Sequence, residues 1–268
     1  MTFLTNYTLV EQMTIQTPSV RTPPVTKNSS ERVLLIVPCF NETDRLNLSV
    51  FAQYSDYSFL FCDDGSTDQT FEILKKFEAT QQSEKSIWAY RCEQNQGKGN
   101  AIWMAYQFAK SEGLLSKFEW IGFWDADLAT PLTEVQYFLN YQQTFAPEKK
   151  LIFGSRILRY GSHIVRDPFR HYLSRVFVTF TDLVLGIKCY DSQCGAKLFH
   201  ISVVDQVFKE KFLSRWIFDL EIIKRIDKNL ILEVPVRQWQ DIPGSKVKFF
   251  REIFRVLNDL FRIRKNYK

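Results

Sequence analysis

Trp120-Ile-Gly-Phe-Trp-Asp-Ala-Asp-Leu-Ala-Thr-Pro131 is an apolar run of strand length that ends in two carboxylates. Residues i and i+2 of a strand share a face, so Asp125 and Asp127 are expected to point the same way. Mg²⁺ and Mn²⁺ commonly bind through one or two carboxylates together with substrate phosphates. The pair therefore indicates chemistry on a nucleoside diphosphate. In the alternative interpretation, Asp125 merely ends the strand and Asp127 caps the helix that Pro131 begins.

Two earlier segments repeat this design of a short buried strand followed by a polar turn. They are Glu31-Arg-Val-Leu-Leu-Ile-Val-Pro-Cys-Phe-Asn-Glu42 and Ser58-Phe-Leu-Phe-Cys-Asp-Asp-Gly-Ser-Thr-Asp-Gln-Thr70. Both strands deliver polar residues at their carboxyl ends, where open α/β sheets bind ligands. A helix is expected after the second strand, with Ser66, Thr67 or Asp68 as its N-cap. The pattern predicts an α/β domain with a ligand site at that edge.

A third polar segment, Asn95-Gln-Gly-Lys-Gly-Asn100, opens an amphipathic helix. Its backbone amides and Lys98 are placed to meet a phosphate, because a helix N-terminus favours anions. The segment is not a phosphate-binding loop of the Walker type. Cys92 stands where the first glycine of that motif should be, and Asn100 replaces its Ser or Thr.

These segments, in this order, resemble the motifs of glycosyltransferase family 2. Later blocks resemble its dolichyl-phosphate β-glucosyltransferase branch, and the resemblance covers roughly residues 31 to 250. Those blocks are Gly154-Ser-Arg156, Asp191-Ser-Gln-Cys-Gly-Ala-Lys-Leu-Phe199, Arg215-Trp-Ile-Phe-Asp-Leu-Glu221 and Val234-Pro-Val with Ile242-Pro-Gly-Ser-Lys246. The resemblance implies a single Rossmann-like α/β domain of the GT-A type over residues 31–245, with a mostly parallel central sheet flanked by helices. We expect a disordered tail at 1–30 and a basic amphipathic helix at 246–268.

The resemblance also implies a donor site for a UDP-sugar. Asp127 would bind the metal, Mg²⁺ or Mn²⁺, that bridges the diphosphate, and Asp125 would contact the ribose or the sugar. A carboxylate accepts the N3 hydrogen of uracil, which favours uracil over cytosine. The nucleotide contacts implied are Pro38, Phe40, Glu42, Asp63, Asp64, Lys98, Asp125, Ser245 and Lys246. In the alternative interpretation, one of Asp63 and Asp64 caps the Ser66 helix and the other binds local turn amides.

Inverting transfer of glucose from UDP-glucose to a polyprenyl phosphate is the activity that the resemblance implies. A lipid phosphate is largely dianionic at neutral pH, so it needs cations more than a general base. Guanidinium groups match phosphate oxygens, and the candidates are Arg156, Arg166, Arg170 and Arg175. A saccharide or protein acceptor would instead need a carboxylate base, for which Asp191, Asp219 and Glu221 are candidates. A third interpretation is a sugar-nucleotide-binding or membrane-adhering module without catalysis.

No stretch reaches the roughly 18 to 20 apolar residues of a spanning helix, and no signal peptide is expected. The eukaryotic enzymes of the branch carry an N-terminal anchor, so this is a departure from their pattern. Residues 246–268 hold eight Lys or Arg against Glu252 and Asp259, a local charge of +6 in a chain of +5. Apolar residues recur there at helical spacing from Lys248 onward, which favours an anionic lipid surface over nucleic acid. We expect a peripheral enzyme on the cytoplasmic face of a membrane.

Two alternatives to that membrane contact stay open. The final helix is packed on the domain in one of them. In the other, Pro168–Lys188 provides the lipid contact, although a helix packed on the sheet is at least as consistent with its pattern. Five cysteines without a CxxC pair indicate reduced thiols rather than a zinc site.

Overall fold

The computed structural model describes residues 32–81, 87–242 and 249–267 of the 268. Side chains of residue 170 and of residues 249–254 are outside this description, although their backbone is within helices. The tail expected at 1–30 also lies outside the described residues.

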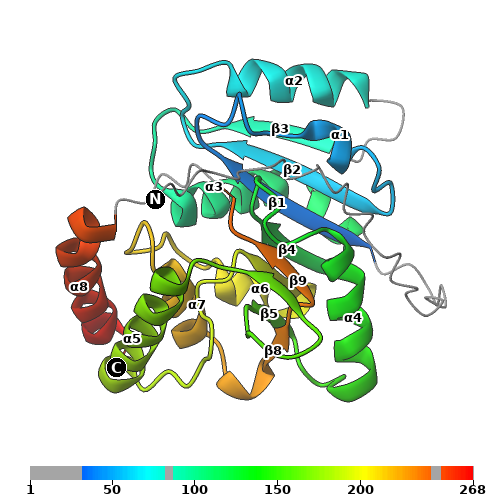
Figure 1. Ribbon diagram of the computed structural model, residues 1–268. Helices are drawn as coiled ribbons and strands as arrows, with labels where there is room; N and C mark the ends of the chain where they lie inside the picture. Colours follow the sequence, from blue (N-terminus) through cyan, green and yellow to red (C-terminus); the bar gives the residue numbers. More distant parts are fainter. Residues whose placement is uncertain (1–31, 82–86, 243–248, 268) are drawn as a thin grey trace, which may run out of the picture. The chain divides into compact units, whose positions relative to one another are not determined.

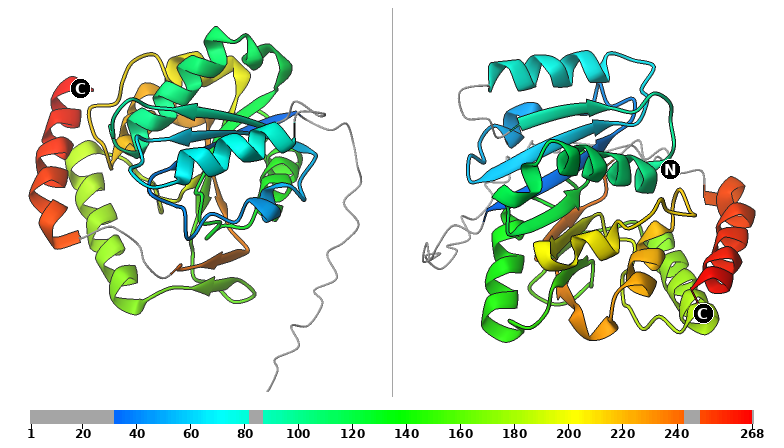
Figure 2. Two further views of the ribbon diagram at one scale, coloured as in Figure 1. Left: turned by 90° about the horizontal axis from the view of Figure 1, so that it is seen from above. Right: turned by 180° about the vertical axis from the view of Figure 1, so that it is seen from behind.

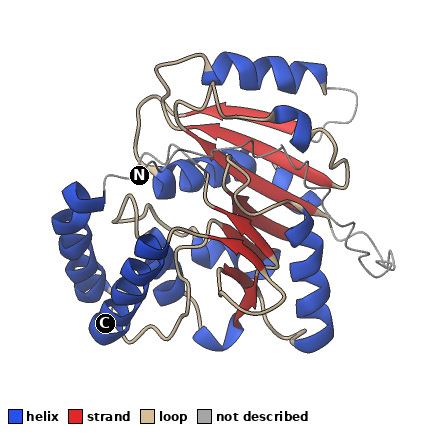
Figure 3. Ribbon diagram, viewed as in Figure 1, coloured by secondary structure: helices blue, strands red, loops and turns tan. Residues whose placement is uncertain are grey.

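A seven-stranded sheet runs through the domain in the order β3-β2-β1-β4-β7-β5-β8 (Figures 1 and 3). All neighbouring strands pair in parallel except β7, which is antiparallel to both β4 and β5. The strands are β1 Val33–Cys39, β2 Tyr57–Asp63, β3 Ile87–Arg91, β4 Trp120–Trp124, β5 Leu151–Ser155, β7 Ala196–His200 and β8 Ile231–Pro235. A separate parallel pair joins β6 (His163–Val165) to β9 (Gln238–Gln240). The expected α/β architecture with a mostly parallel sheet is confirmed.

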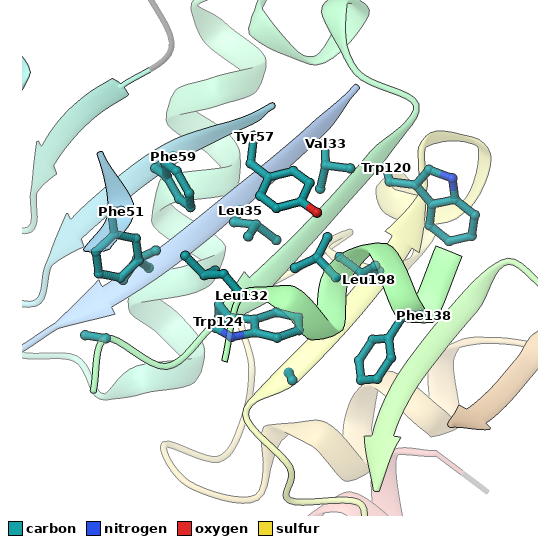
Figure 4. Packing of buried hydrophobic residues seen from close by; sticks show 14 of the residues in the cluster. Val33, Leu35, Phe51, Tyr57, Phe59, Trp120, Trp124, Leu132, Phe138 and Leu198 are labelled. Carbon is teal, nitrogen blue, oxygen red and sulfur yellow. The ribbon is translucent and has the colours of Figure 1, made fainter. Parts of the chain in front are cut away.

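Helices cover both faces of this sheet, and strand side chains alternate between them. Leu35 and Val37 of β1 join Phe51, Leu74 and other apolar residues of α1, α2 and α4 in one cluster (Figure 4). Leu34 and Ile36 join the cluster under α3, α6 and α7. These helices and the short 3-10 turns are α1 Leu48–Phe51, α2 Thr70–Thr80, α3 Lys98–Ser111, η1 Leu114–Lys117, α4 Thr133–Phe145, α6 Ile201–Val207, α7 Phe218–Arg225 and η2 Lys228–Leu230. β1 is buried on both faces, as parallel central strands are.

Two further helices, α5 (Pro168–Leu185) and α8 (Phe249–Asn266), lie side by side at one end of the sheet (Figures 1 and 2). Leu260 and Ile263 of α8 are fully buried in a cluster with Leu185 of α5 and Leu220 of α7. Asp259 accepts a hydrogen bond from the Ser214 hydroxyl at 2.7 Å. The second half of α8 is therefore packed on the domain, as the alternative interpretation of this segment predicts. Among the described residues, no helix is both long and apolar enough to cross a membrane.

Packing of α8 makes a stability prediction. Leu260→Ala removes a fully buried side chain, so we expect the free energy of unfolding to fall by about 2 to 3 kcal/mol. Phe261→Ala is the matched control. Phe261 is the next residue along α8 and its side chain is 53% exposed, so its removal should lower the free energy of unfolding by less than about 1 kcal/mol. Urea denaturation measures both values. Equal, small losses would mean that α8 is not part of the core.

Candidate active site

The carboxyl ends of β1, β2 and β4 meet at one edge of the sheet, because these three strands are neighbours and parallel. The chain order reverses here, since β2 and β3 lie on one side of β1 and β4 on the other. Such a switch point is where open α/β sheets bind ligands. Asp63, Asp64, Asp125 and Asp127 all follow or end these strands. The structure thus brings together the carboxylates that the sequence places on separate strands.

Asp63 and Asp64 are buried and held by backbone amides. The Asp63 carboxylate accepts from the Ser66 amide at 3.2 Å and lies 3.3 Å from Nε of Arg91. The two oxygens of Asp64 accept from the amides of Gln96 and Gly97 at 2.8 and 2.9 Å. Burial raises the pKa of both carboxyl groups, and the amide hydrogen bonds offset part of that rise. These contacts match the alternative interpretation only in part. Amides do hold Asp64, but they belong to a distant turn, and α2 begins at Thr70, so Asp63 does not cap it.

The turn after β1 is tied to the turn after β2. Asn41 has a left-handed backbone with φ of 51°, which asparagine tolerates better than most residues. The Glu42 amide donates to the Thr70 hydroxyl at 2.8 Å, and the Glu42 carboxylate pairs with Arg45 at 2.6 Å. Pro38 and Phe40 are partly buried beside this turn. Three of the expected nucleotide contacts thus lie at one strand end.

Asp125 and Asp127 have different surroundings although they are only two residues apart. Asp125 lies 2.5 Å from Nζ of Lys98, and its side chain stays 37% exposed, so a ligand can reach it. Oδ1 of Asp127 accepts from the Ala129 amide at 3.1 Å. The helix after them, α4, begins at Thr133, so Asp127 closes a turn and does not cap that helix.

The electrostatics of this carboxylate pair suit a cation. Burial and then the neighbouring Asp125 charge raise the pKa of Asp127. Burial alone would lower the pKa of Lys98, but the charges of Asp125 and Asp219 outweigh it and raise that pKa. Within the described part of the chain, no three His, Cys, Asp or Glu side chains converge as metal ligands. Two hard oxygen donors with ligand positions left for phosphates fit Mg²⁺ or Mn²⁺.

A glycine lets the backbone before β7 approach Asp125. A Cβ atom on Gly195 would lie 1.8 Å from Oδ2 of Asp125, so any larger residue would displace the Asp125 carboxylate from this position. Behind this contact, the fully buried Lys197 donates to the Ser192 carbonyl at 3.0 Å and lies 2.8 Å from Oδ1 of Asp219. Lys197 therefore anchors the segment that packs on Asp125.

Arg156, at the carboxyl end of β5, is paired with Asp191. Its Nε and Nη2 donate to the two carboxylate oxygens at 2.6 and 2.8 Å, and its backbone amide donates at 3.0 Å. Burial would raise the pKa of Asp191, but this ion pair holds it well below its usual range. A carboxylate with a depressed pKa is a poor general base near neutral pH. The pairing favours a positioning role for Asp191 over the expected role of base.

Two more arginines belong to this region: Arg166 lies over the Trp239 ring, as Arg156 does, and the charge of Arg175 acts on Arg166. Nη2 of Arg166 donates to the Ser174 hydroxyl at 2.5 Å, and Arg175 donates to the Tyr190 carbonyl and stacks on the Tyr190 ring at 3.8 Å. Burial and then the charge of Arg156 lower the pKa of Arg166. The arginine cluster, defined as Arg156, Arg166 and Arg175, thus concentrates positive charge. The side chain of Arg170 and all of Ser245 and Lys246 lie outside the described residues.

A family model for glycosyl transferase family 2 matches residues 34–208. The chain belongs to glycosyltransferase family 2. Dolichyl-phosphate beta-glucosyltransferase of Homo sapiens is 30% identical over 91% of this chain and 78% of its own length. The enzyme of that name from Drosophila melanogaster is 30% identical over 96% and 81%, and that of Saccharomyces cerevisiae is 27% identical over 87% and 74%. The protein is a glycosyltransferase.

Solved structures agree on the fold. Mannosyl-3-phosphoglycerate synthase from Rubrobacter xylanophilus superposes with a TM-score of 0.60 at 15% identity, over 88% of this chain and 75% of the other. Glucosyl-3-phosphoglycerate synthase from Mycobacterium tuberculosis, solved with UDP, gives 0.58 at 16% identity, over 91% and 86%. The glycosyltransferase domain has the GT-A fold.

Two site residues of this glycosyltransferase are absent from the sequence-based candidates. Lys197 stands among apolar residues in β7, and a charged residue within an apolar strand is the only signal of its role in the sequence. Arg215 lies against Gly97, where a Cβ atom would come within 2.7 Å of it, and donates to the Asn95 side chain. Arg215 therefore braces the turn whose amides hold Asp64, and no spacing in the sequence indicates this contact.

Proposed function

We propose that this glycosyltransferase transfers glucose from UDP-glucose to a polyprenyl phosphate, with inversion, using a divalent cation at the cytoplasmic face of a membrane. The curated relatives are dolichyl-phosphate beta-glucosyltransferases by name, which supports the sugar and the acceptor class. Glu42, Asp63 and Asp64, at the carboxyl ends of β1 and β2, are the groups that we assign to the uridine. The exposed basic residues of α8, such as Arg262, Arg264 and Lys265, are suited to an anionic lipid surface.

One observation carries the choice of acceptor: each candidate base is already engaged. Asp191 pairs with Arg156, and Asp219 pairs with the buried Lys197. Glu221 is fully buried and accepts from the amides of Leu213 and Ser214. A sugar or protein hydroxyl needs a base to lose its proton, whereas a phosphate dianion does not. This favours the polyprenyl phosphate over the runner-up, a family 2 enzyme that glycosylates a saccharide or a protein.

The chain's own residues hold both reactants. Lys98 and the N-terminus of α3 face the edge where the donor diphosphate is expected, and Lys98 keeps Asp125 in place. A cation bound by Asp127 would offset the charge that develops on the departing UDP. Arg156 uses two of its five N–H donors on Asp191, which leaves three for a phosphate. The segment 191–195 contacts Asp125 through Gly195 and Arg156 through Asp191, so the groups expected to hold donor and acceptor flank the same short segment.

The direct test is an assay with radiolabelled UDP-glucose, UDP-galactose or GDP-mannose and a polyprenyl phosphate. Of the three donors, only UDP-glucose is expected to give a product that can be extracted into organic solvent. A product from GDP-mannose would overturn the sugar assignment. Efficient transfer to a free saccharide with none to the lipid would favour the runner-up.

A second prediction concerns the nucleotide. Asp64→Ala removes the acceptor expected for uracil N3 and frees the amides of Gln96 and Gly97, so we expect the Kd for UDP to rise by about tenfold, or about 1.4 kcal/mol. Isothermal titration calorimetry measures it. Asp56→Ala is the control, because Asp56 is an exposed carboxylate at the opposite end of β2. Wild-type affinity in a folded Asp64→Ala variant would remove the uracil assignment.

A further inference from the structure

Helix α5 is apolar on two sides. Phe177, Phe180 and Val184 face the cluster shared with α7 and α8. On another side, four large apolar side chains are 62 to 82% exposed, namely Phe169, Tyr172, Val176 and Leu183. Their spacing of three, four and seven residues puts them in one stripe along the helix. A helix that only packs on a domain presents polar residues outward, so this stripe, the α5 stripe, calls for a partner.

The chain around the α5 stripe is basic and also exposes apolar residues. Residues 156–190 hold six Lys or Arg against two Asp, a local charge of +4. Leu158, Tyr160 and Val165 in the segment before α5 are exposed as well. Exposed apolar side chains among positive charges match the interface of a bilayer that contains anionic lipid.

The α5 stripe also adjoins the arginine cluster. Ser174 and Arg175 belong to α5 itself, and Ser174 accepts from Arg166. In addition, α8 lies beside α5 and carries the exposed basic residues Arg262, Arg264 and Lys265 (Figure 2). A phosphate on a lipid in the same bilayer would then meet these arginines without leaving the membrane surface.

We propose that the α5 stripe is the surface by which this glycosyltransferase docks on anionic membranes. The idea rests on the proposed function for the lipid acceptor, whereas docking itself is measured without catalysis. The apolar contact with the membrane is thereby assigned to α5 and not to α8, because Leu260 and Ile263 of α8 are buried in the domain. A second copy of the chain is a poorer occupant, because pairing two α5 stripes brings two segments of charge +4 together.

The test uses the full chain and vesicles of phosphatidylcholine, with or without phosphatidylserine. We expect wild-type protein to co-sediment at least about tenfold better with the mixed vesicles, and less at high salt. The Val176→Ser/Leu183→Ser double variant should bind them at least about tenfold less well, since two apolar side chains leave the contact. Phe145→Ser is the matched control, because Phe145 is 71% exposed on α4. It should bind as wild type.

Activity separates docking from the choice of acceptor. The double variant should keep its UDP affinity and its transfer to a short-chain, water-soluble polyprenyl phosphate, but lose transfer to polyprenyl phosphate embedded in mixed vesicles. Equal vesicle binding by wild type and the double variant would overturn the proposal. So would a wild-type dimer that the double variant abolishes in size-exclusion chromatography. Wild-type protein that binds the vesicles as expected but transfers glucose to neither acceptor would support docking through the α5 stripe and overturn the proposed function.

Discussion

We expect Asp127→Asn to lower Mg²⁺- or Mn²⁺-supported glucosyl transfer by about a hundredfold, or about 2.7 kcal/mol of barrier. The change removes one anionic ligand and hardly alters the volume. Asn still accepts from the Ala129 amide through its side-chain oxygen, so the turn after β4 is retained. Initial rates at saturating donor measure the effect.

Asp127→Asn should lower activity without lowering thermal stability. Burial and the Asp125 charge raise the pKa of Asp127 above its unfolded value, so its ionised form weakens the folded state at neutral pH. That penalty fades as the pH falls through the raised folded pKa, and Asn removes it at every pH. The metal-free variant should therefore melt at the wild-type temperature or above it.

Two controls accompany this prediction. EDTA should inhibit the wild-type enzyme, and added Mg²⁺ or Mn²⁺ should restore it. Asp56→Asn makes the same chemical change at the opposite edge of the sheet and should leave the rate unaltered. If neither EDTA nor Asp127→Asn slows transfer, the carboxylate pair is structural.

The sequence was enough to predict the sheet and the edge at which the candidate carboxylates meet. Apolar strands followed by polar turns predict where β1, β2 and β4 end, and parallel neighbours bring those ends together. The antiparallel direction of β7 was not predictable, because the apolar pattern of a buried strand is the same whichever way the strand runs. The docking of α8 also could not be decided, since an amphipathic helix has the same pattern on a protein core and on a lipid surface.

Within the site, the sequence indicated residue types but not their pairings. Arg156 and Asp191 are 35 residues apart and meet only because β5 and β7 are neighbours in the sheet. Lys197 appears in the sequence as one more charged residue, yet it is fully buried between the rings of Phe123 and Phe153. Such contacts depend on the tertiary arrangement of several strands, which local spacing does not encode.

The Arg156–Asp191 pair should give the largest stability effect. Arg156→Met leaves the Asp191 carboxylate buried without its partner, so we expect the free energy of unfolding to fall by about 3 to 5 kcal/mol. Asp191→Asn should cost a similar amount, and the Arg156→Met/Asp191→Asn double variant less than the sum of the two. The folded pKa of Asp191 lies below the unfolded one, so the pair stabilises above the unfolded pKa. The gap between wild type and Arg156→Met should close as the pH falls below about 4.

The same three variants separate stability from acceptor binding. If the remaining N–H donors of Arg156 hold the acceptor phosphate, Arg156→Met and the double variant should both lose at least about tenfold in transfer to polyprenyl phosphate. Their slow hydrolysis of UDP-glucose by water should persist, because it uses only the donor site. Asp191→Asn keeps the guanidinium and should retain more of the transfer. Recovery of transfer in the double variant would make Arg156 a scaffold residue, since stability alone would then explain the single-variant loss. Equal losses of transfer and hydrolysis in Arg156→Met would instead place Arg156 beside the donor.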